Sequence, residues 1–316
     1  MMTRMVMQRI GIGFVTLWVV SVIVFIATSI LPGDVAQIVL GQSATPETLA
    51  ALRAELGLDQ PWYVRYFGWL GNMVTGDLGI SKAGGATIES LIGGRLGNTL
   101  MMAGWVAVIS IPISIALGLW AAMHPGTWLD RIVTFGTLSL ISVPEFFIAT
   151  VAVLILAVEL HWLPSTAYMT GEETFLELMK ALAMPLITLV IVVSAQMIRM
   201  TRAGILNVMS SPYIEMAILK GVPRARIILR HAFFNAIGPI INVIALNLAY
   251  LVSGVVIVET IFAYPGLAKL MIDGVQTRDL PLVQACAMIF CGTYVVLILI
   301  ADVGSILSNP RLRNPK

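Results

Sequence analysis

Residues 99–123 read TLMMAGWVAVISIPISIALGLWAAM, a run without a single aspartate, glutamate, lysine or arginine. The hydrocarbon layer of a bilayer is about 30 Å thick, and a helix that crosses it needs about 20 mostly apolar residues. Within lipid, a helix also satisfies its backbone hydrogen bonds inside its own segment. The run therefore predicts a transmembrane helix, and it decides the class of the fold.

Further stretches of the same character lie on both sides of this one, at residues 10–31, 132–160, 181–200, 236–258 and 282–307. The stretch 132–160 is too long for one straight crossing and contains Pro144 followed by Glu145, so we expect a tilt or a kink there. The first stretch follows Arg4 and Arg9 and is longer than the apolar region of a signal peptide, so we expect an uncleaved first span. The chain is predicted to be an all-α polytopic membrane protein with six transmembrane helices.

The composition of the whole chain agrees with this class. Hydrophobic residues make up 58% of the 316 residues and charged residues 11%, against about 25% charged residues in soluble domains. A soluble fold is excluded, and so is a disordered chain, which needs low hydrophobicity and high net charge. The formal net charge of +2 gives no reason to expect a nucleic-acid partner. The two cysteines, Cys286 and Cys291, lie in an apolar stretch and are expected to be reduced.

Lysine and arginine set the orientation of the spans. They gather in the segments that lie inside when the N-terminus is cytoplasmic, whereas the two short outer loops are mainly acidic. Both termini are therefore predicted to be cytoplasmic. The chain then divides into the N-terminus with the first span (1–31), an extracytoplasmic segment (32–97), a five-helix core with a cytoplasmic loop (98–308, loop 201–235) and a cytoplasmic tail (309–316).

The outer segment 32–97 carries its own helix signals. Thr45 is placed as an N-cap before Pro46, and Gly57 is placed to end that helix. A second helix is expected from Pro61 onward. The segment is therefore predicted to hold two short helices outside the membrane.

Two roles are open for the aromatic run 62–69 in the second of these helices: a belt at the membrane interface, which is favoured, or a docking surface for an outside partner. Segment 32–97 and the loop 259–281 are the sizeable pieces expected outside. We therefore expect them to form the surface that an outside partner contacts, with Asp77 and Lys82 as candidate contact residues.

The cytoplasmic loop contains a helix–glycine–helix pattern at residues 211–235. Ser211 is placed as the N-cap of the first helix, and Pro212 occupies its first position. Gly221 can adopt the left-handed conformation that ends a helix, and Pro223 can start the next one. The second helix is basic, with Arg226 and Arg230 four residues apart, and by composition alone it fits a helix lying on anionic lipid.

A resemblance gives this loop a second interpretation. Its residues are similar to the coupling motif of ABC-transporter permeases, which has Glu-Ala-Ala, a glycine, an isoleucine and a proline. The matching residues are Glu215, Ala217, Gly221, Ile227 and Pro239, with Met216 in place of the first alanine. In that family the helix pair docks into a groove on a cytoplasmic ATP-hydrolysing subunit.

The resemblance covers nearly the whole chain. Several motifs in the right order resemble the oligopeptide, dipeptide and nickel branch of the family: Arg9-Ile10, residues 31–34, 56–61, 76–79, 142–147, 259–267 and 309–313. This resemblance implies the type I ABC-importer permease fold in a bacterial inner membrane. It also implies a coupling role for Glu215, Ala217, Gly221, Ile227 and Arg230.

The partners and the substrate follow from the same resemblance. It implies a second related permease subunit, two ATP-binding subunits that hold ATP and magnesium, and an extracytoplasmic substrate-binding protein. Membrane lipid surrounds the spans. Di- or oligopeptides are the expected substrates, and nickel chelates, glutathione-like molecules and oligosaccharides are the alternatives.

The chain itself carries no signature of chemistry. A nucleotide-binding loop of the type Gly-x-x-x-x-Gly-Lys-Ser/Thr is absent from the sequence, as are His-Glu-x-x-His and Cys-x-x-Cys. We therefore expect no cofactor or metal on this chain and no enzyme activity. A proton-coupled secondary transporter is a distant alternative, because such a carrier does not need the helix–glycine–helix loop and inverted repeats are not evident.

Carboxylates at membrane depth are candidate functional residues. Glu145 follows Pro144 near the middle of its span, and it can either line the pore or form a structural hydrogen bond between helices. Asp302, near the cytoplasmic end of the last span, is expected to reach water or a basic partner. Glu159, beside His161, is expected at the outer interface.

Overall fold

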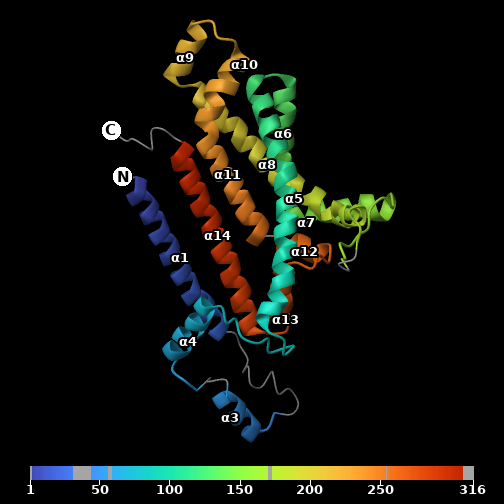
Figure 1. The fold of residues 1–316 in the computed structure, drawn as a ribbon. Helices are drawn as coiled ribbons and strands as arrows, with labels where there is room; N and C mark the ends of the chain where they lie inside the picture. Colours follow the sequence, from blue (N-terminus) through green and yellow to red (C-terminus); the bar gives the residue numbers. More distant parts are fainter. Residues whose placement is uncertain (1, 31–43, 56–58, 170–172, 254, 309–316) are drawn as a thin grey trace.

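A computed structural model describes residues 2–30, 44–55, 59–169, 173–253 and 255–308. In this part of the chain nearly all regular structure is helical, and the chain is drawn in Figure 1. The elements are α1 (Met2–Ile30), α3 (Pro46–Glu55), α4 (Trp62–Thr75), α5 (Ile88–Met123), α6 (Trp128–Ser142), α7 (Glu145–Ala152), η2 (Val153–Glu159), α8 (Phe175–Met209), α9 (Pro212–Leu219), α10 (Arg224–Arg226), η3 (Ile227–Ala232), α11 (Phe233–Ser253), α12 (Val256–Ile261), α13 (Leu267–Gln276) and α14 (Leu280–Ser308).

Five of the described helical segments are long and apolar enough to cross a membrane, and they begin with α1, α5, α8, α10 and α14. A sixth is formed by α6 with α7 and η2 if this bent pair counts as one span. The all-helical class and the spans read from the sequence are confirmed. The predictions for Gly57, for residues 31–34 and for the tail 309–316 fall outside the described residues.

The kink predicted at Pro144 is a break, since α6 and the α7–η2 segment meet at 99°. Pro144 has no N–H to donate and pushes the preceding residue out of the helical region. Val143 accordingly has an extended backbone, with φ −89° and ψ 129°. The helix cannot continue through these residues, and α7 starts in a new direction. Its continuation η2 is π-helical, which the sequence did not indicate.

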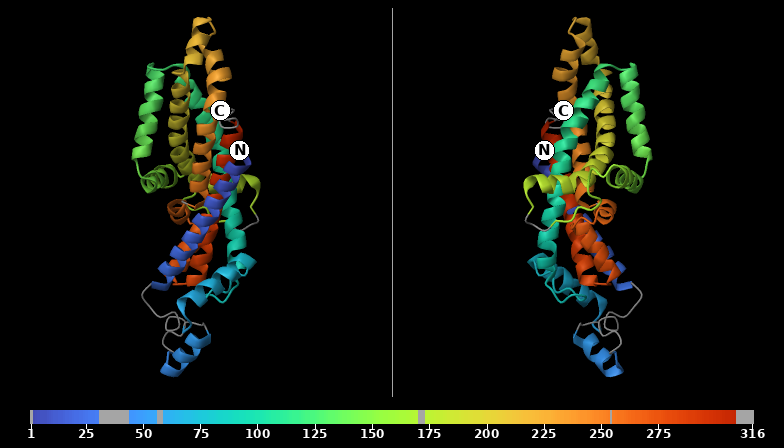
Figure 2. Two further views of the ribbon diagram at one scale, coloured as in Figure 1. Left: turned by 90° about the vertical axis from the view of Figure 1, so that its left-hand side faces the viewer. Right: turned by 90° about the vertical axis from the view of Figure 1, so that its right-hand side faces the viewer.

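The two ends of the molecule carry different elements (Figures 1 and 2). The start of α1, the end of α14 and the α9–α10 region point to one end, whereas α3, α4 and α13 lie toward the other. α7 and α12 lie between these levels, about half-way along α14 (Figure 1). This layout places both described chain ends on the side of the loop 201–235.

Small residues let the central helices α5 and α8 approach each other closely. A Cβ added to Gly118 of α5 would stand 2.7 Å from Cβ of Thr201 in α8. Ser114, one turn before Gly118, donates a long hydrogen bond of 3.4 Å to the carbonyl oxygen of Ser194. The rest of the fold packs around this pair.

The first helix packs along α14, and polar contacts join the two helices near both ends. Arg9 forms an ion pair of 3.0 Å with Asp302 near the end of α14. Toward the other end, Gln284 of α14 donates a hydrogen bond of 2.6 Å to Thr28. The expectation that Asp302 meets water or a basic partner is confirmed by its pairing with Arg9.

Candidate functional site

The segment Pro212–Ala232, which we call the α9–η3 hairpin, stands at one tip of the molecule (Figures 1 and 2). Pro212 occupies the first turn of α9, as the sequence predicts. Ser211 is the N-cap residue, as the sequence predicts, but its hydroxyl does not bond to α9 and donates instead to the carbonyl oxygen of Val208 at 2.6 Å. That carbonyl belongs to the last turn of α8, where carbonyls lack helical partners, so it competes for the hydroxyl.

Gly221 forms the turn between the two arms of the hairpin and has φ 73°, in the left-handed region. The N–H of Val222 donates to the carbonyl oxygen of Ala217 at 3.2 Å, and the N–H of Gly221 donates to that of Ile218 at 2.9 Å. This pair of bonds is the Schellman arrangement that ends a helix at a left-handed residue. The predicted glycine turn is therefore present, and Ala217 takes part through its backbone.

The outer surface of α9 combines apolar and charged side chains. Met216, Ile218 and Leu219 are exposed, and Leu219 is 74% accessible. Glu215 and Lys220 are exposed beside them. Exposed apolar side chains that gather in one place on a protein mark surfaces that meet a partner or a membrane.

The other arm of the hairpin is divided between an inner and an outer face. Ile227 is 1% exposed, so it packs inside this chain and does not present itself to a partner. Ile214 is the buried residue of α9, which packs against η3. Arg230 points to solvent. The second arm is only briefly α-helical before it becomes π-helical at Ile227, where the sequence pattern indicated a regular helix.

A buried ion pair lies near the base of the hairpin. Arg202 of α8 donates from Nε to Oδ1 of Asp130 at 2.6 Å and from Nη2 to Oδ2 at 2.8 Å. The Gly126 N–H, in the loop between α5 and α6, adds a bond of 2.9 Å to the same carboxylate. This fork joins the start of α6 to the part of α8 that leads into α9. The two residues are 72 positions apart, and no local pattern in the sequence could have revealed the pair.

Glu145 lies at the start of α7, directly after the break. The hydroxyl of Tyr250 in α11 donates to Oε2 of Glu145, and Oε1 is buried without a partner among the described residues. The hydrogen bond between helices, one of the two roles that the sequence left open, is present, and it does not test whether Glu145 also lines the pore. Glu145 thereby connects the bent segment to the core.

At the opposite end of the molecule, Asp77 and Lys82 are both exposed. Asp77 precedes, and Lys82 lies within, a tight loop in which the Ser81 N–H donates to the carbonyl oxygen of Ala86 at 2.9 Å. The Ser81 hydroxyl donates to buried Asp279, just before α14. The loop is thus fixed to the core while its charged side chains remain accessible.

A buried carboxylate organises the segment between α12 and α13. Glu259 is 1% exposed and accepts hydrogen bonds from the Thr99 hydroxyl at 2.8 Å and from the Lys269 N–H at 2.9 Å. It thereby satisfies a free N–H group at the start of α13. A Cβ on Gly266 would stand 2.0 Å from Oε1 of Glu259, so only glycine fits there. The sequence marked the 259–267 motif but gave no role to either residue.

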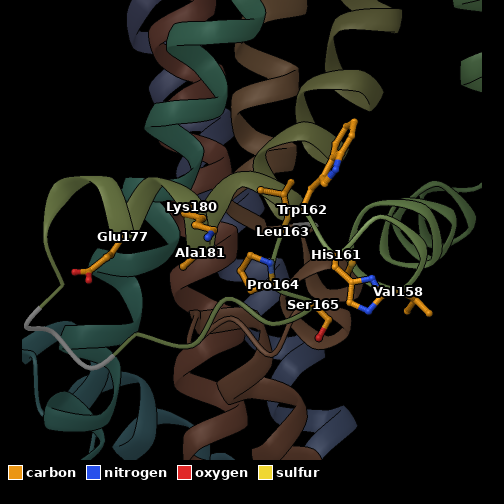
Figure 3. Close-up of a pocket in the computed structure, with 10 residues that line it drawn as sticks. Val158, His161, Trp162, Leu163, Pro164, Ser165, Glu177, Lys180 and Ala181 are labelled. Carbon is orange, nitrogen blue, oxygen red and sulfur yellow. The ribbon is translucent and has the colours of Figure 1, made fainter.

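A hollow of about 580 Å³ opens between η2, the loop after it and the start of α8. Figure 3 shows Lys180 on one side of Pro164, and the Ser165 hydroxyl and the His161 ring on the other. Glu177 lies at the far edge with its carboxylate turned away (Figure 3). In the part of the chain that the structure describes, no three His, Cys, Asp or Glu side chains are grouped to hold a metal ion.

Comparison with known proteins identifies the family. Residues 114–314 match the model of the binding-protein-dependent transport system inner membrane component, and residues 2–89 match the model of its N-terminal region. The chain belongs to this family of permeases.

Relatives match the permease over nearly its whole length. A protein of Brucella melitensis named a peptide transport system permease is 35% identical over 314 residues, or 99% of each chain. A peptide ABC transporter permease of Sinorhizobium fredii is 30% identical over 98% of each chain. The glutathione transport system permease of Escherichia coli K12 is 33% identical over 94% of this chain and 95% of its own.

The permease is therefore a multi-pass inner-membrane subunit of a binding-protein-dependent ABC importer and is not itself an enzyme. The resemblance to the oligopeptide branch that was read from separate motifs is confirmed.

Proposed function

We propose that this permease imports di- or oligopeptides and forms half of the translocation pathway. Its partners in this proposal are a second related permease, two cytoplasmic ATP-binding subunits and an extracytoplasmic binding protein. The observation that carries the proposal is the α9–η3 hairpin, which presents exposed apolar and charged side chains on a fixed turn at one tip of the molecule. ATP and magnesium belong to the partner subunits.

The connections of the hairpin support a coupling role for it. α9 follows α8 directly, and η3 continues into α11, so both arms lead into core helices. The Asp130–Arg202 pair adds α6 to the same unit. Closure of the ATP-binding subunits would displace the hairpin and thereby move α6, α8 and α11 together, which is the rigid-element motion that switching proteins use. In this proposal Glu215, Gly221 and Arg230, which are exposed on the hairpin, face the ATP-binding subunit.

The layout of the chain supports a topology with both termini in the cytoplasm. The start of α1 and the end of α14 share one end of the bundle with the hairpin, and the basic residues gather there (Figure 1). Positive charge at short loops favours the cytoplasmic side. Segment 32–97, as far as it is described, then lies outside with α13.

The pathway is expected beside the bent segment. Non-helical backbone at membrane depth is tolerated only where protein covers it or where it lines a water-filled cavity. The break before Glu145 interrupts a membrane segment, and α7 lies about half-way along α14 (Figure 1). We therefore assign this level to the path shared with the second permease, with Glu145 among the residues that line it.

The outer surface is proposed to receive the binding protein, with Asp77 and Lys82 as contacts. Both residues are exposed on a loop that Asp279 fixes to the core. The test is to replace both residues with alanine and to measure how strongly the binding protein stimulates ATP hydrolysis. Reduced stimulation is expected, and unchanged stimulation would remove these two residues from the contact surface.

The substrate class rests on the names of relatives, which are peptide permeases in Brucella and glutathione permeases in Escherichia coli. A glutathione-like substrate is therefore the second candidate. Nickel chelates and oligosaccharides are supported only by the resemblance to the oligopeptide, dipeptide and nickel branch. The deciding experiment reconstitutes the complex with its binding protein in proteoliposomes and compares ATP-driven uptake of tri-alanine and glutathione.

Uptake of tri-alanine that requires both ATP and the binding protein is the expected result. Uptake of glutathione alone would replace the substrate assignment. Uptake of tri-alanine without ATP would contradict the import mechanism itself, because the energy would then come from another source. Omission of the binding protein serves as the control for leakage.

A further inference from the structure

We infer that the hollow between η2 and the start of α8 binds the carboxylate group of the substrate on its way through the permease, with Lys180 as the cationic ligand. This inference rests on the proposed function and adds a site to it. The hollow measures about 580 Å³, within the range of small-molecule sites in proteins.

Donors without a partner face the hollow. In the part of the chain that the structure describes, the Lys180 ammonium and the Ser165 hydroxyl have no hydrogen-bond partner. Nδ1 of His161 lies 3.3 Å from the carbonyl oxygen of Glu159, which can only accept, so the neutral ring spends its one N–H there and offers the hollow no donor. An ammonium and a hydroxyl donor together suit a carboxylate, since bonds to ionised groups are the strong ones.

The carboxylate that lines the same hollow, Glu177, does not pair with Lys180. Glu177 precedes Lys180 by three residues, a spacing at which helical side chains can pair. Its Oε2 accepts instead from the Thr174 N–H at 2.9 Å and from the Thr174 hydroxyl at 2.7 Å. This capping box holds Glu177 at the helix start, away from Pro164 and Ser165 (Figure 3). The hollow therefore keeps the positive charge of Lys180.

The wall of the hollow is held in a fixed shape. The carbonyl oxygen of Leu156 accepts from the Trp162 N–H at 2.9 Å and from the Leu163 N–H at 3.3 Å. Farther along the loop, the Ala167 N–H donates to the carbonyl oxygen of Phe262 at 2.7 Å. His161 has φ 55°, a costly conformation for a residue with a Cβ. Such strain persists only where surrounding contacts enforce it, and it concentrates at functional sites.

Lys180 is exposed and lies in the second turn of α8. This helix belongs to a helical segment long and apolar enough to cross the membrane. Charged side chains in such segments face a water-filled cavity or the bundle interior and mark substrate pathways. A peptide carries a carboxylate at its C-terminus, and the hollow offers that group an accessible cation that has no partner among the described residues. The phosphate of an anionic lipid shares this chemistry, so the test must separate the two sources.

The experiment places a thiol in the hollow and measures its electrostatic environment. In the complex assembled with its partner subunits, Cys286 and Cys291 are replaced with alanine and Ser165 with cysteine. Modification rates are measured with a sulfonate-bearing and a trimethylammonium-bearing methanethiosulfonate reagent, in nanodiscs of phosphatidylcholine. Lys180→Gln tests the ligand, and Lys269→Gln is the matched control, because Lys269 pairs with Asp273 at 3.1 Å in α13.

The anionic reagent should react about tenfold faster than the cationic one, relative to a free thiol, because a cationic cleft concentrates anions. Lys180→Gln should abolish this preference, and Lys269→Gln should leave it intact. Tri-alanine should protect the thiol more strongly than tri-alanine amide, which lacks the carboxylate. A preference that survives Lys180→Gln overturns the inference, and so does equal protection by the acid and the amide.

Lipid is tested by adding phosphatidylglycerol to the nanodiscs. Protection by this lipid that tri-alanine cannot displace would assign the hollow to a headgroup and overturn the substrate site. The reagent preference can be measured without transport, so it tests the cationic hollow independently of the proposed import function. If wild-type complex keeps the preference but imports no tri-alanine, the proposed function fails while the cationic hollow stands.

Discussion

Gly221 is the position at which the coupling proposal can be tested most sharply. Its φ of 73° lies in the left-handed region, and an added Cβ would meet no atom of this chain within 4 Å. The cost of substitution to the fold is therefore the backbone cost alone. For alanine this is about 1–2 kcal/mol, and for asparagine it is smaller, because asparagine visits this conformation more readily.

Three variants separate the turn from a docking groove. The folding costs should rise in the order Gly221→Asn, Gly221→Ala, Gly221→Val, since valine is β-branched and suits a left-handed residue least. The cost of entering a tight groove on a partner should instead follow side-chain size, so that asparagine and valine are both harmful. Asparagine is therefore the informative variant, because its side chain is large but its free-energy cost in the left-handed conformation is small.

The assay uses the purified complex and scores retained ATP-binding subunits, binding-protein-stimulated ATP hydrolysis and the unfolding midpoint. Gly221→Asn should lower stimulation about tenfold, which corresponds to about 1.4 kcal/mol of lost interaction, with a nearly unchanged midpoint. Gly126→Asn is the matched control. Gly126 has φ 78° and equal free space, and it lies in the α5–α6 loop outside the hairpin.

If Gly221→Asn keeps full assembly and full stimulation of ATP hydrolysis, Gly221 does not enter a tight groove on the ATP-binding subunit. The same conclusion follows if the stimulation lost in Gly221→Val is no larger than its loss of folding stability explains. Glu215→Ala adds an independent arm. It should weaken retention of the ATP-binding subunits if the carboxylate contacts them. If the hairpin only lies on lipid, the same change should leave assembly intact and strengthen attraction to anionic lipid.

Three further predictions concern the fold that supports the hairpin. Gly266→Ala should lower the free energy of unfolding by about 3 kcal/mol, because the new methyl group displaces the buried Glu259 carboxylate at α13. Thermal unfolding measures this loss. Gly71→Ala is the control and should be harmless, because no atom of the chain lies within 4 Å of the added Cβ. Arg202→Gln should cost about 3 kcal/mol by leaving Asp130 buried and unpaired, and adding Asp130→Asn should recover part of the loss in the same assay. A cysteine at Gly84 should react with an impermeant reagent from outside, whereas one at the tip of the α9–η3 hairpin should be spared; the reverse pattern would invert the topology.

The sequence predicted the elements that depend on local chemistry. Long apolar runs indicated the spans, and the glycine turn at Gly221 followed from the conformational freedom of glycine. Pro144 indicated a kink, but not its size, because the angle depends on how α7 packs against α8 and α12. Ser211 occupies the predicted N-cap position, but the sequence did not indicate that its hydroxyl would bond to the end of the preceding helix.

The contacts that the sequence missed join residues far apart along the chain. Asp130 pairs with Arg202, and Glu259 accepts from Thr99, 160 residues away. A charged residue at membrane depth indicates that a partner is needed, but nothing in a single sequence says which residue supplies it. For Asp302 the kind of partner was predicted, yet Arg9 was identified only by the structure.

The attachment of α1 has a consequence for the order in which the permease is made. α1 packs mainly on α14, and the bond from Gln284 to Thr28 spans 256 residues. At about 5–20 residues per second, the ribosome needs roughly 15–60 s to make the chain, and α1 has to wait through most of that time for its neighbour. Until then Arg9 sits near the membrane without the carboxylate that neutralises it. Until α14 is made, α1 is held where Ser21 and Phe25 contact Tyr66 of α4. A chain cut short before α14 therefore leaves the remaining length of α1 without its main neighbour and open to proteases.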